Sequence, residues 1–234
     1  MGELPPYLAI EIGKHVVHRL AVGHADITGD DFGGIFAAAI GGNHRKKPLG
    51  IADVTWENCA WSVKTIQDAN PFNKQIVRII SGRNSPSYSS NISDPYANIQ
   101  ATGDAVLSVW NARVNEALNA HDDLRIFVMI RNMATLEFSL FEYEATRYIS
   151  KHYRWERNKN DNFEGFDIQT GEHTFTWQSH GSQFTVLHRV PPSAYRFRIR
   201  RTPGTIEEQR VLDMIGFSED WIEPVAPPSD DRHI

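Results

Sequence analysis

The order of helix-like and strand-like patterns along the chain limits it to a small set of folds. Apolar residues recur at helical spacing in two long segments, 7–22 and 96–119, and a run of small residues at 35–42 predicts a short helix between them. Strand-like apolar runs occur at 49–66, 75–80, 124–130 and 136–144. The order helix, strands, helix, strands predicts an α/β protein whose mixed β-sheet is flanked by helices.

The chain changes character after about residue 150. Residues 154–167 and 170–190 are polar, aromatic and rich in turn-forming residues, which indicates a β-rich segment. We therefore expect a core domain over 1–150, a β-rich C-terminal extension over 151–224 and a flexible tail over 225–234.

Composition is that of an ordinary globular protein. Of the 234 residues, 41% are hydrophobic and six are tryptophan, enough for a proper core. No segment reaches eighteen uncharged apolar residues, and the first residues lack a basic start followed by an apolar core. We therefore expect no transmembrane helix, no membrane partner and no signal peptide. A lone cysteine, Cys59, excludes an internal disulfide and a cysteine-based zinc site, and it agrees with a cytoplasmic protein.

A charged pair interrupts the apolar hairpin at 49–66. Asp53 lies in its first strand and Lys64 in its second, and both are flanked by apolar residues. An acid and a lysine on adjacent strands can form a cross-strand ion pair that only stabilises the sheet. Charges against an apolar background, however, need a partner or a chemical role. Ser62 shares a face with Lys64, so that a hydroxyl and an ammonium form a small polar site.

Metal-dependent phosphodiester cleavage is the chemistry that fits these groups. Asp53 supplies hard oxygen ligands for Mg²⁺, and the backbone carbonyl of Val63 adds another. Lys64 would orient or deprotonate the attacking water.

The hairpin resembles the site of the PD-(D/E)XK nuclease superfamily: an acid near the end of one strand, a tight turn, and Ser62-Val63-Lys64 on the next strand. The chain departs from that pattern twice, because Ala52 replaces the proline and Ser62 replaces the second acid. A Ser-X-Lys version is known among type II restriction endonucleases, in which a glutamate from elsewhere supplies the missing carboxylate. In element order the resemblance covers roughly residues 7–145.

The resemblance implies a restriction-endonuclease-like core and a type II restriction enzyme: a sequence-specific, Mg²⁺-dependent endonuclease acting on double-stranded DNA. Two alternatives stay open. One is a DNA repair or mobile-element nuclease of the same superfamily, and the other is a non-catalytic DNA- or protein-binding module in which Asp53 and Lys64 form only an ion pair. Cutting both strands at a palindrome predicts a homodimer, because a twofold axis places two equivalent sites on antiparallel strands.

The resemblance also requires a carboxylate in place of Ser62. Glu11 on the first helix is the preferred candidate, because many members of the superfamily carry a metal-binding glutamate on the helix before the site. A solvated charge on an amphipathic helix explains Glu11 equally well. Glu57 lies in the hairpin turn, where a polar residue is common. Glu142 and Glu144 share a face of one strand and can be structural edge charges.

Three groups of residues are predicted to contact DNA. They are Arg196, Arg198 and Arg200; Gln178, Ser179, His180, Ser182 and Gln183; and Arg45, Lys46 and Lys47. The arginines alternate on one face of a predicted strand and suit phosphates, although a solvated face explains them too. The residues around Gly181 include types that read base edges, although a polar hairpin tip is the simpler explanation. The net charge of −5 argues against binding through bulk charge, so basic residues must gather on one surface.

Overall fold

The fold is described from a computed structural model of the chain, over residues 5–223. The flexible tail predicted at 225–234 lies outside the described residues. The helices are α1 (Pro6–Ala21), α2 (Gly29–Ile40), α3 (Pro86–Ser90), α4 (Ile99–Leu118) and α5 (Glu208–Ile215). None of the helices within residues 5–223 combines the length and the apolar character that crossing a bilayer requires.

A six-stranded mixed sheet forms the centre of the molecule. In spatial order it contains β1 (Asn43–Leu49), β2 (Ala52–Trp56), β3 (Cys59–Gln67), β5 (Asp123–Asn132), β6 (Glu137–Glu144) and β11 (Tyr195–Arg198). The first three strands form an antiparallel meander, whereas β3 and β5 run parallel. A parallel pair needs a long crossover, and the connection from β3 to β5 includes α4. The predicted α/β class, with a mixed sheet flanked by helices, is confirmed.

A second, antiparallel sheet is built from both halves of the chain. Its order is β4 (Ile76–Arg83), β10 (Gln183–Arg189), β9 (His173–Gln178), β8 (Phe163–Asp167) and β7 (Tyr153–Arg157). The segment after residue 150 is therefore rich in strands, but β10 pairs with β4, and β11 returns to pair with β6 in the first sheet. The boundary expected at residue 150 does not separate two structural units, because both sheets cross it.

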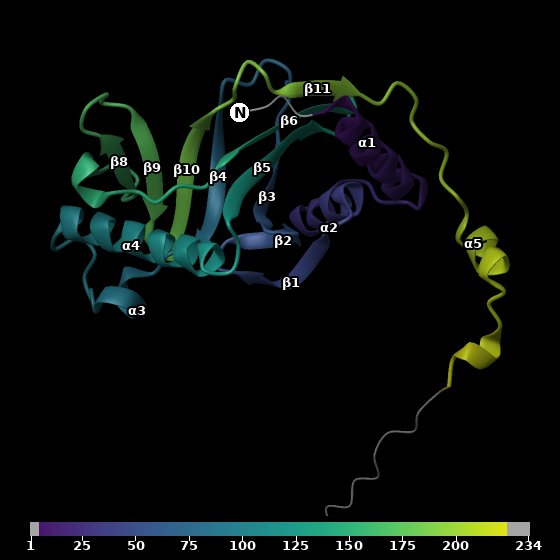
Figure 1. The fold of residues 1–234 in the computed structure, drawn as a ribbon, viewed down its shortest axis with the longest axis horizontal. Coiled ribbons are helices and arrows are strands. Elements are labelled where there is room, and N and C mark those ends of the chain that lie inside the picture. Colours follow the sequence, from purple (N-terminus) through teal and green to yellow (C-terminus); the bar gives the residue numbers. More distant parts are fainter. Residues whose placement is uncertain (1–4, 224–234) are drawn as a thin grey trace, which may run out of the picture.

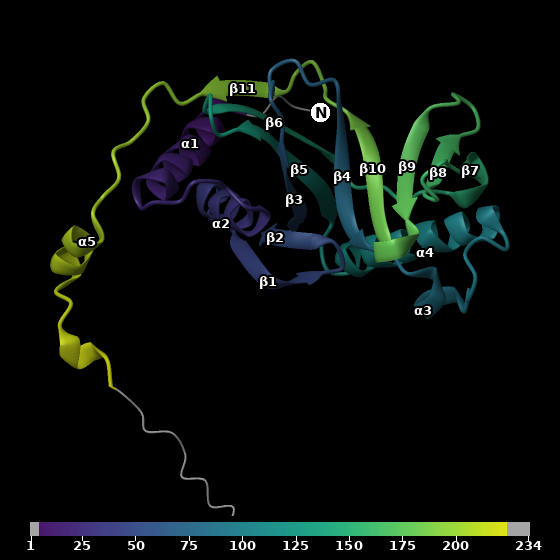
Figure 2. The same ribbon diagram turned by 180° about the vertical axis from the view of Figure 1, so that it is seen from behind.

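Two hydrophobic cores lie on opposite faces of the six-stranded sheet. Helices α1 and α2 cover one face, where Phe36 stacks on Phe127 with ring centroids 4.2 Å apart. Helix α4 and the second sheet cover the other face, and Trp110 of α4 is buried there. Figures 1 and 2 show this order, with the six-stranded sheet between α1–α2 and the α4 side.

Three elements differ from the sequence expectation. Helix α2 begins earlier than the small-residue run, because Thr28 and Asp31 form a capping box at its start. Strand β1 has no apolar alternation and was expected only as a basic cluster; it is mostly exposed and hydrogen-bonds to β2. Residues 81–95 are rich in Ser, Asn and Pro, which predicts a loop, but part of this segment continues β4 and then forms α3.

Candidate active site

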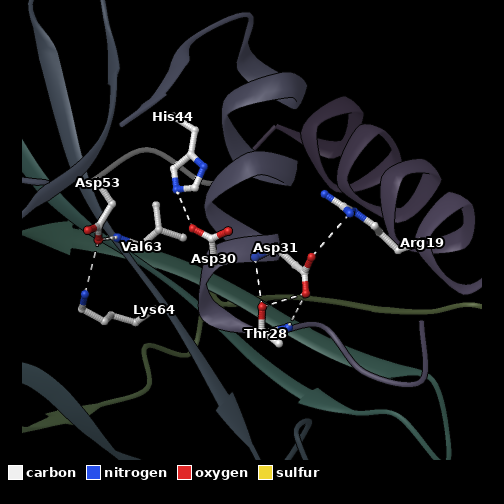
Figure 3. Close-up of polar contacts among 8 residues, drawn as sticks. All are labelled: Arg19, Thr28, Asp30, Asp31, His44, Asp53, Val63 and Lys64. Carbon is white, nitrogen blue, oxygen red and sulfur yellow. Dashed lines mark hydrogen bonds and ion pairs between the residues drawn. The ribbon is translucent and has the colours of Figure 1, made fainter. Parts of the chain in front are cut away.

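Three donors converge on one oxygen of Asp53. Its Oδ2 accepts hydrogen bonds from the backbone N–H of Val63 at 3.0 Å, the hydroxyl of Ser62 at 3.3 Å and the Nζ of Lys64 at 3.4 Å. Figure 3 shows Asp53, Val63 and Lys64 in this arrangement. Among the described residues no donor reaches the other oxygen, Oδ1. The structure thus brings together the four residues that the hairpin pattern singled out.

The diverging ends of two strands create this arrangement. The β2–β3 ladder extends from the turn at Glu57 only as far as Val54 and Trp61. Beyond this pair of residues β2 no longer pairs with β3. There the Asp53 carboxylate, instead of a backbone carbonyl of β2, accepts the hydrogen bond from the N–H of Val63. The N–H and C=O of an extended residue point to the same side, so the Val63 carbonyl faces the same edge as its N–H.

A cavity of about 400 Å³ opens at this edge. It is lined by Gly29, Asp30, His44, Arg45, Lys46, Pro48, Asp53, Val63, Lys64 and Thr65. The side chains of Asp53 and Lys64 are 22% and 24% exposed, so both are accessible from the cavity. Arg45 and Lys46 come from β1, and they make one rim of the cavity cationic. Lys47, from the same cluster, is exposed and does not line it.

Asp30 is a cavity residue that the sequence did not indicate, whereas His44 belongs to the basic stretch that continues with Arg45, Lys46 and Lys47. Asp30 lies in the first turn of α2 with its side chain 92% exposed, and its Oδ1 is 3.7 Å from Nε2 of His44. Its neighbour Asp31 instead caps the helix through Thr28. Figure 3 shows Asp30 on the cavity side and Asp31 turned toward Arg19. Two consecutive acids before a small-residue helix were visible in the sequence, but nothing in it indicated which one faces the hairpin.

The oxygen donors of the cavity fit the implied Mg²⁺. Carboxylates, carbonyls and hydroxyls are its preferred protein ligands. Asp53, Asp30 and the carbonyl of Val63 supply the first two kinds, and the Oγ1 of Thr65 is buried without a hydrogen-bond partner among the described residues. Over residues 5–223 no three His, Cys, Asp or Glu side chains lie close enough together to hold an ion by themselves. A bound ion would therefore need backbone or water oxygens as well.

None of the four glutamates considered from the sequence lines this cavity. Glu11 on α1 forms an ion pair with Lys14, with Oε1 and Nζ 2.6 Å apart. Glu57 occupies the β2–β3 turn with a φ of 49°. Glu142 accepts from Arg125 and Trp61, which gives it a structural role, and Glu144 is exposed at the end of β6.

The arginine strand differs from its prediction. Strand β11 ends at Arg198, so Arg200 is not part of it. Arg196 donates to backbone carbonyls, among them that of Phe72 at 3.0 Å, and Arg198 forms an ion pair with Glu137. This acid was not foreseen because it lies on β6, which β11 meets only through the returning chain. Neither arginine lines the cavity.

The polar turn predicted to contact bases joins β9 to β10. Gln178 and Gln183 are ladder partners, and Ser179–Gly181 forms a single 3₁₀ turn between them. Ser182, not the glycine, takes the left-handed conformation, with a φ of 51°. The Ser179 hydroxyl hydrogen-bonds to Tyr96 at 2.7 Å, whereas His180 is exposed. These residues do not line the cavity at Asp53.

Arg113 of α4 connects the hairpin to the rest of the molecule. Its guanidinium donates to the carbonyl of Gly50 at 3.3 Å and to that of Ser81 at 2.9 Å. Burial lowers the pKa of Arg113, and the negative charge of Asp53 opposes that shift. Arg113 therefore fixes the β1–β2 turn, three residues before Asp53. No pattern in the sequence indicated this contact.

Comparison of the chain with protein-family models, with curated proteins and with solved structures found no match.

Proposed function

We propose that this protein is a sequence-specific, Mg²⁺-dependent endonuclease that hydrolyses double-stranded DNA, as type II restriction enzymes do. One observation supports it most: Asp53 and Lys64 meet at an open strand edge, in a cavity whose rim carries Arg45 and Lys46. A cationic rim attracts the phosphates of DNA toward the acid–lysine pair. The order of a helix, the site hairpin, a covering helix and further strands also agrees with a PD-(D/E)XK nuclease core.

Asp53, Asp30 and the Val63 carbonyl would hold the Mg²⁺, with Asp30 in the place expected for Glu11. When bound, Mg²⁺ lowers the pKa of a water molecule and polarises a phosphoryl oxygen. Ser62 and Val63 fix Oδ2 of Asp53 and keep Oδ1 directed away from the protein donors. The ammonium of Lys64 orients the attacking water and balances the charge that develops on the phosphate oxygens.

Twofold symmetry is part of the proposal. Each chain carries one copy of the Asp53–Lys64 site, and a palindromic duplex offers two antiparallel strands, so a homodimer would cut both. A cytoplasmic location, where such an enzyme meets incoming DNA, is also part of it.

One observation favours a second candidate, the non-catalytic binding module. Asp53 and Lys64 already form an ion pair with Oδ2 and Nζ 3.4 Å apart, and the described residues contain no group of three His, Cys, Asp or Glu side chains that could hold a metal ion. In that case the pair would only stabilise the edge of the sheet.

Plasmid cleavage by the purified protein, with Mg²⁺ or with EDTA, tests the proposal. Mg²⁺-dependent discrete bands support a restriction enzyme. A smear or nicking supports a repair or mobile-element nuclease, and no cleavage supports the binding module.

Variants at the acid–lysine pair give the sharper result. Asp53→Asn and Lys64→Ala should each lower the cleavage rate by about 100-fold or more, because each removes a group that acts in the transition state. Lys64→Ala should still bind DNA in a gel-shift assay. The exposed Lys151 is a matched control, and Lys151→Ala should leave cleavage unchanged. Equal loss of binding and cleavage in Lys64→Ala would make Lys64 a phosphate anchor instead.

A further inference from the structure

Residues 206–222 form an exposed amphipathic arm, which contains α5 and a 3₁₀ turn at Glu219–Trp221. In α5, Val211, Leu212 and Ile215 share one side of the helix, and Gln209 and Asp213 share the other. None of the residues of α5 is buried. An isolated eight-residue helix is unstable in water unless its apolar face packs against something.

The apolar residues of the arm form an unusually exposed set. The exposed fractions are 77% for Met214, 67% for Ile222, 61% for Trp221 and 56% for Ile215. Single exposed apolar residues are ordinary, but so many in one short segment indicate an interaction surface.

The start of the arm is fixed at one end of α1. The backbone N–H of Ile206 donates to the carbonyl of Ala21 at 2.7 Å. From there the arm leads away from both sheets, as Figures 1 and 2 show. Only Glu207 separates Ile206 from α5. The chain would have to reverse its direction at that residue for α5 to pack along its own α1. Another molecule is the more accessible partner.

The same chain carries an apolar groove that matches α5 in size. The groove lies between α1 and β11 and has a volume of about 430 Å³. It is lined by Ala9, Ile10, Gly13, Lys14, Val17, Tyr195, Phe197, Arg198 and Ile199. The α1 side, from Ala9 to Val17, spans about 12 Å, and so does α5. At its floor α1 lies close to β11, since a Cβ on Gly13 would make ordinary van der Waals contact with the ring of Phe197, at 3.5 Å.

The charges of arm and groove are complementary. The arm contains the acids Glu207, Glu208, Asp213, Glu219 and Asp220 and one base, Arg210. The groove is bordered by Lys14 and Arg198, which already form ion pairs with Glu11 and Glu137 of the same chain. The additional positive charge comes from Arg200 and Arg201, which follow directly in the chain. An acidic arm is repelled by nucleic acid and by anionic membranes. A basic-rimmed apolar groove is the surface that fits it.

We propose that the arm of each copy packs its apolar face into the α1–β11 groove of a second copy, so that two chains exchange arms around a twofold axis. An isologous exchange buries both grooves and both arms at once, which closes the assembly as a dimer. This inference needs only the arm and the groove, and it holds whether or not the protein cleaves DNA.

Disulfide trapping tests which chain the arm occupies. In a Cys59→Ser background, chains with Ile215→Cys and one tag are mixed with chains carrying Val17→Cys and another tag, allowed to exchange and then oxidised. We expect a cross-linked product containing both tags. Gln209→Cys, on the polar side of α5, is the matched control and should cross-link at least about tenfold less than Ile215→Cys. Absence of the mixed product, or equal cross-linking by the control, would overturn the proposal.

Sedimentation supplies a readout that does not depend on cross-linking. The wild-type chain should sediment as a dimer, and Val211→Asp should lose that dimer, because a charge would enter the groove. Gln209→Asp introduces the same charge on the polar face and should dimerise like the wild type. Both positions are exposed, so neither change should disturb the fold of the single chain. A monomeric wild type, or equal dimers from both variants, would remove the arm exchange. A monomer would also remove the homodimer from the proposed function, whereas the plasmid assay tests DNA cleavage independently of both.

Discussion

Asp53 is held by groups that lie nine to eleven residues further along the chain. Where β2 leaves β3, the N–H of Val63 loses its strand partner, and the carboxylate replaces it at 3.0 Å. An unpaired backbone donor costs free energy, so this contact positions Asp53 without help from a ligand. The other carboxylate oxygen, Oδ1, accepts from none of the described donors, and Asp53 lines the same cavity as Asp30.

The placement of Asp30 leads to a prediction about the missing carboxylate. Asp30→Asn should lower the cleavage rate by about tenfold or more and raise the Mg²⁺ concentration needed for half-maximal cleavage, because it removes a charged oxygen ligand from the cavity. Glu11→Gln should have little effect, since its exposed ion pair with Lys14 contributes at most about 1 kcal/mol to stability. Mg²⁺ titrations of cleavage by both variants provide the measurement. The opposite result would return the role to Glu11.

At the scale of elements, the β1–β2 turn is fixed against α4. Gly50 has a φ of 60°, and a Cβ on it would lie 2.0 Å from the carbonyl oxygen of Arg113. The Arg113 side chain in turn donates to the carbonyl of Gly50. The turn therefore has no room for a side chain at residue 50. A larger residue there would fit only if α4 and the β1–β2 turn moved apart.

Gly50→Ala should therefore lower the free energy of unfolding by about 3 kcal/mol or more, through backbone strain plus a steric clash. Gly171→Ala is a matched control: its φ of 71° is similar, but a Cβ there would meet nothing within 4 Å. It should cost only about 1–2 kcal/mol, from the left-handed backbone alone. Urea unfolding of the two variants gives the comparison. Equal losses of unfolding free energy in the two variants would show that Arg113 moves aside at little cost in stability.

At the scale of the whole molecule, the two sheets meet through stacked rings. His188 of β10 lies parallel to Tyr143 of β6, with ring centroids 3.6 Å apart and an interplanar angle of 10°. Burial lowers the pKa of His188 from 6.5 to about 4. The charged form of this side chain is therefore unfavourable between the sheets.

A pH dependence of stability follows from this shift. Between pH 6.5 and about 4 the unfolded chain binds a proton at His188 that the folded chain does not, so the free energy of unfolding should fall as the pH falls through this range. Below about pH 4 both states are protonated and this contribution levels off. His188→Phe keeps an aromatic ring and should flatten the dependence. Urea unfolding at pH 4 to 7 measures it, with the exposed His180→Gln as control. An unchanged slope in His188→Phe would place its origin elsewhere.

Local patterns were enough to predict the main elements and the heart of the candidate site. Periodicity gave α1, α4 and the central strands, because each depends on which neighbours along the chain are apolar. Asp53 and Lys64 were found together because they lie on two strands joined by the short turn at Glu57 and Asn58. A short turn determines which residues of its two strands lie opposite each other. The contact between Asp53 and Lys64 therefore depends only on about a dozen consecutive residues.

Contacts between distant segments were decided only by the tertiary structure. Asp30 and Arg45 line the cavity because α2 packs on the sheet and β1 pairs antiparallel with β2. The arginine strand acquired the acid Glu137 because β11 returns to β6, about 60 residues away in sequence. The sequence alone determines those structures that depend on residues close together in the chain, such as single helices and hairpins. The pairing of remote strands, and the surfaces that they bring together, depends on how the whole chain buries its apolar faces at once.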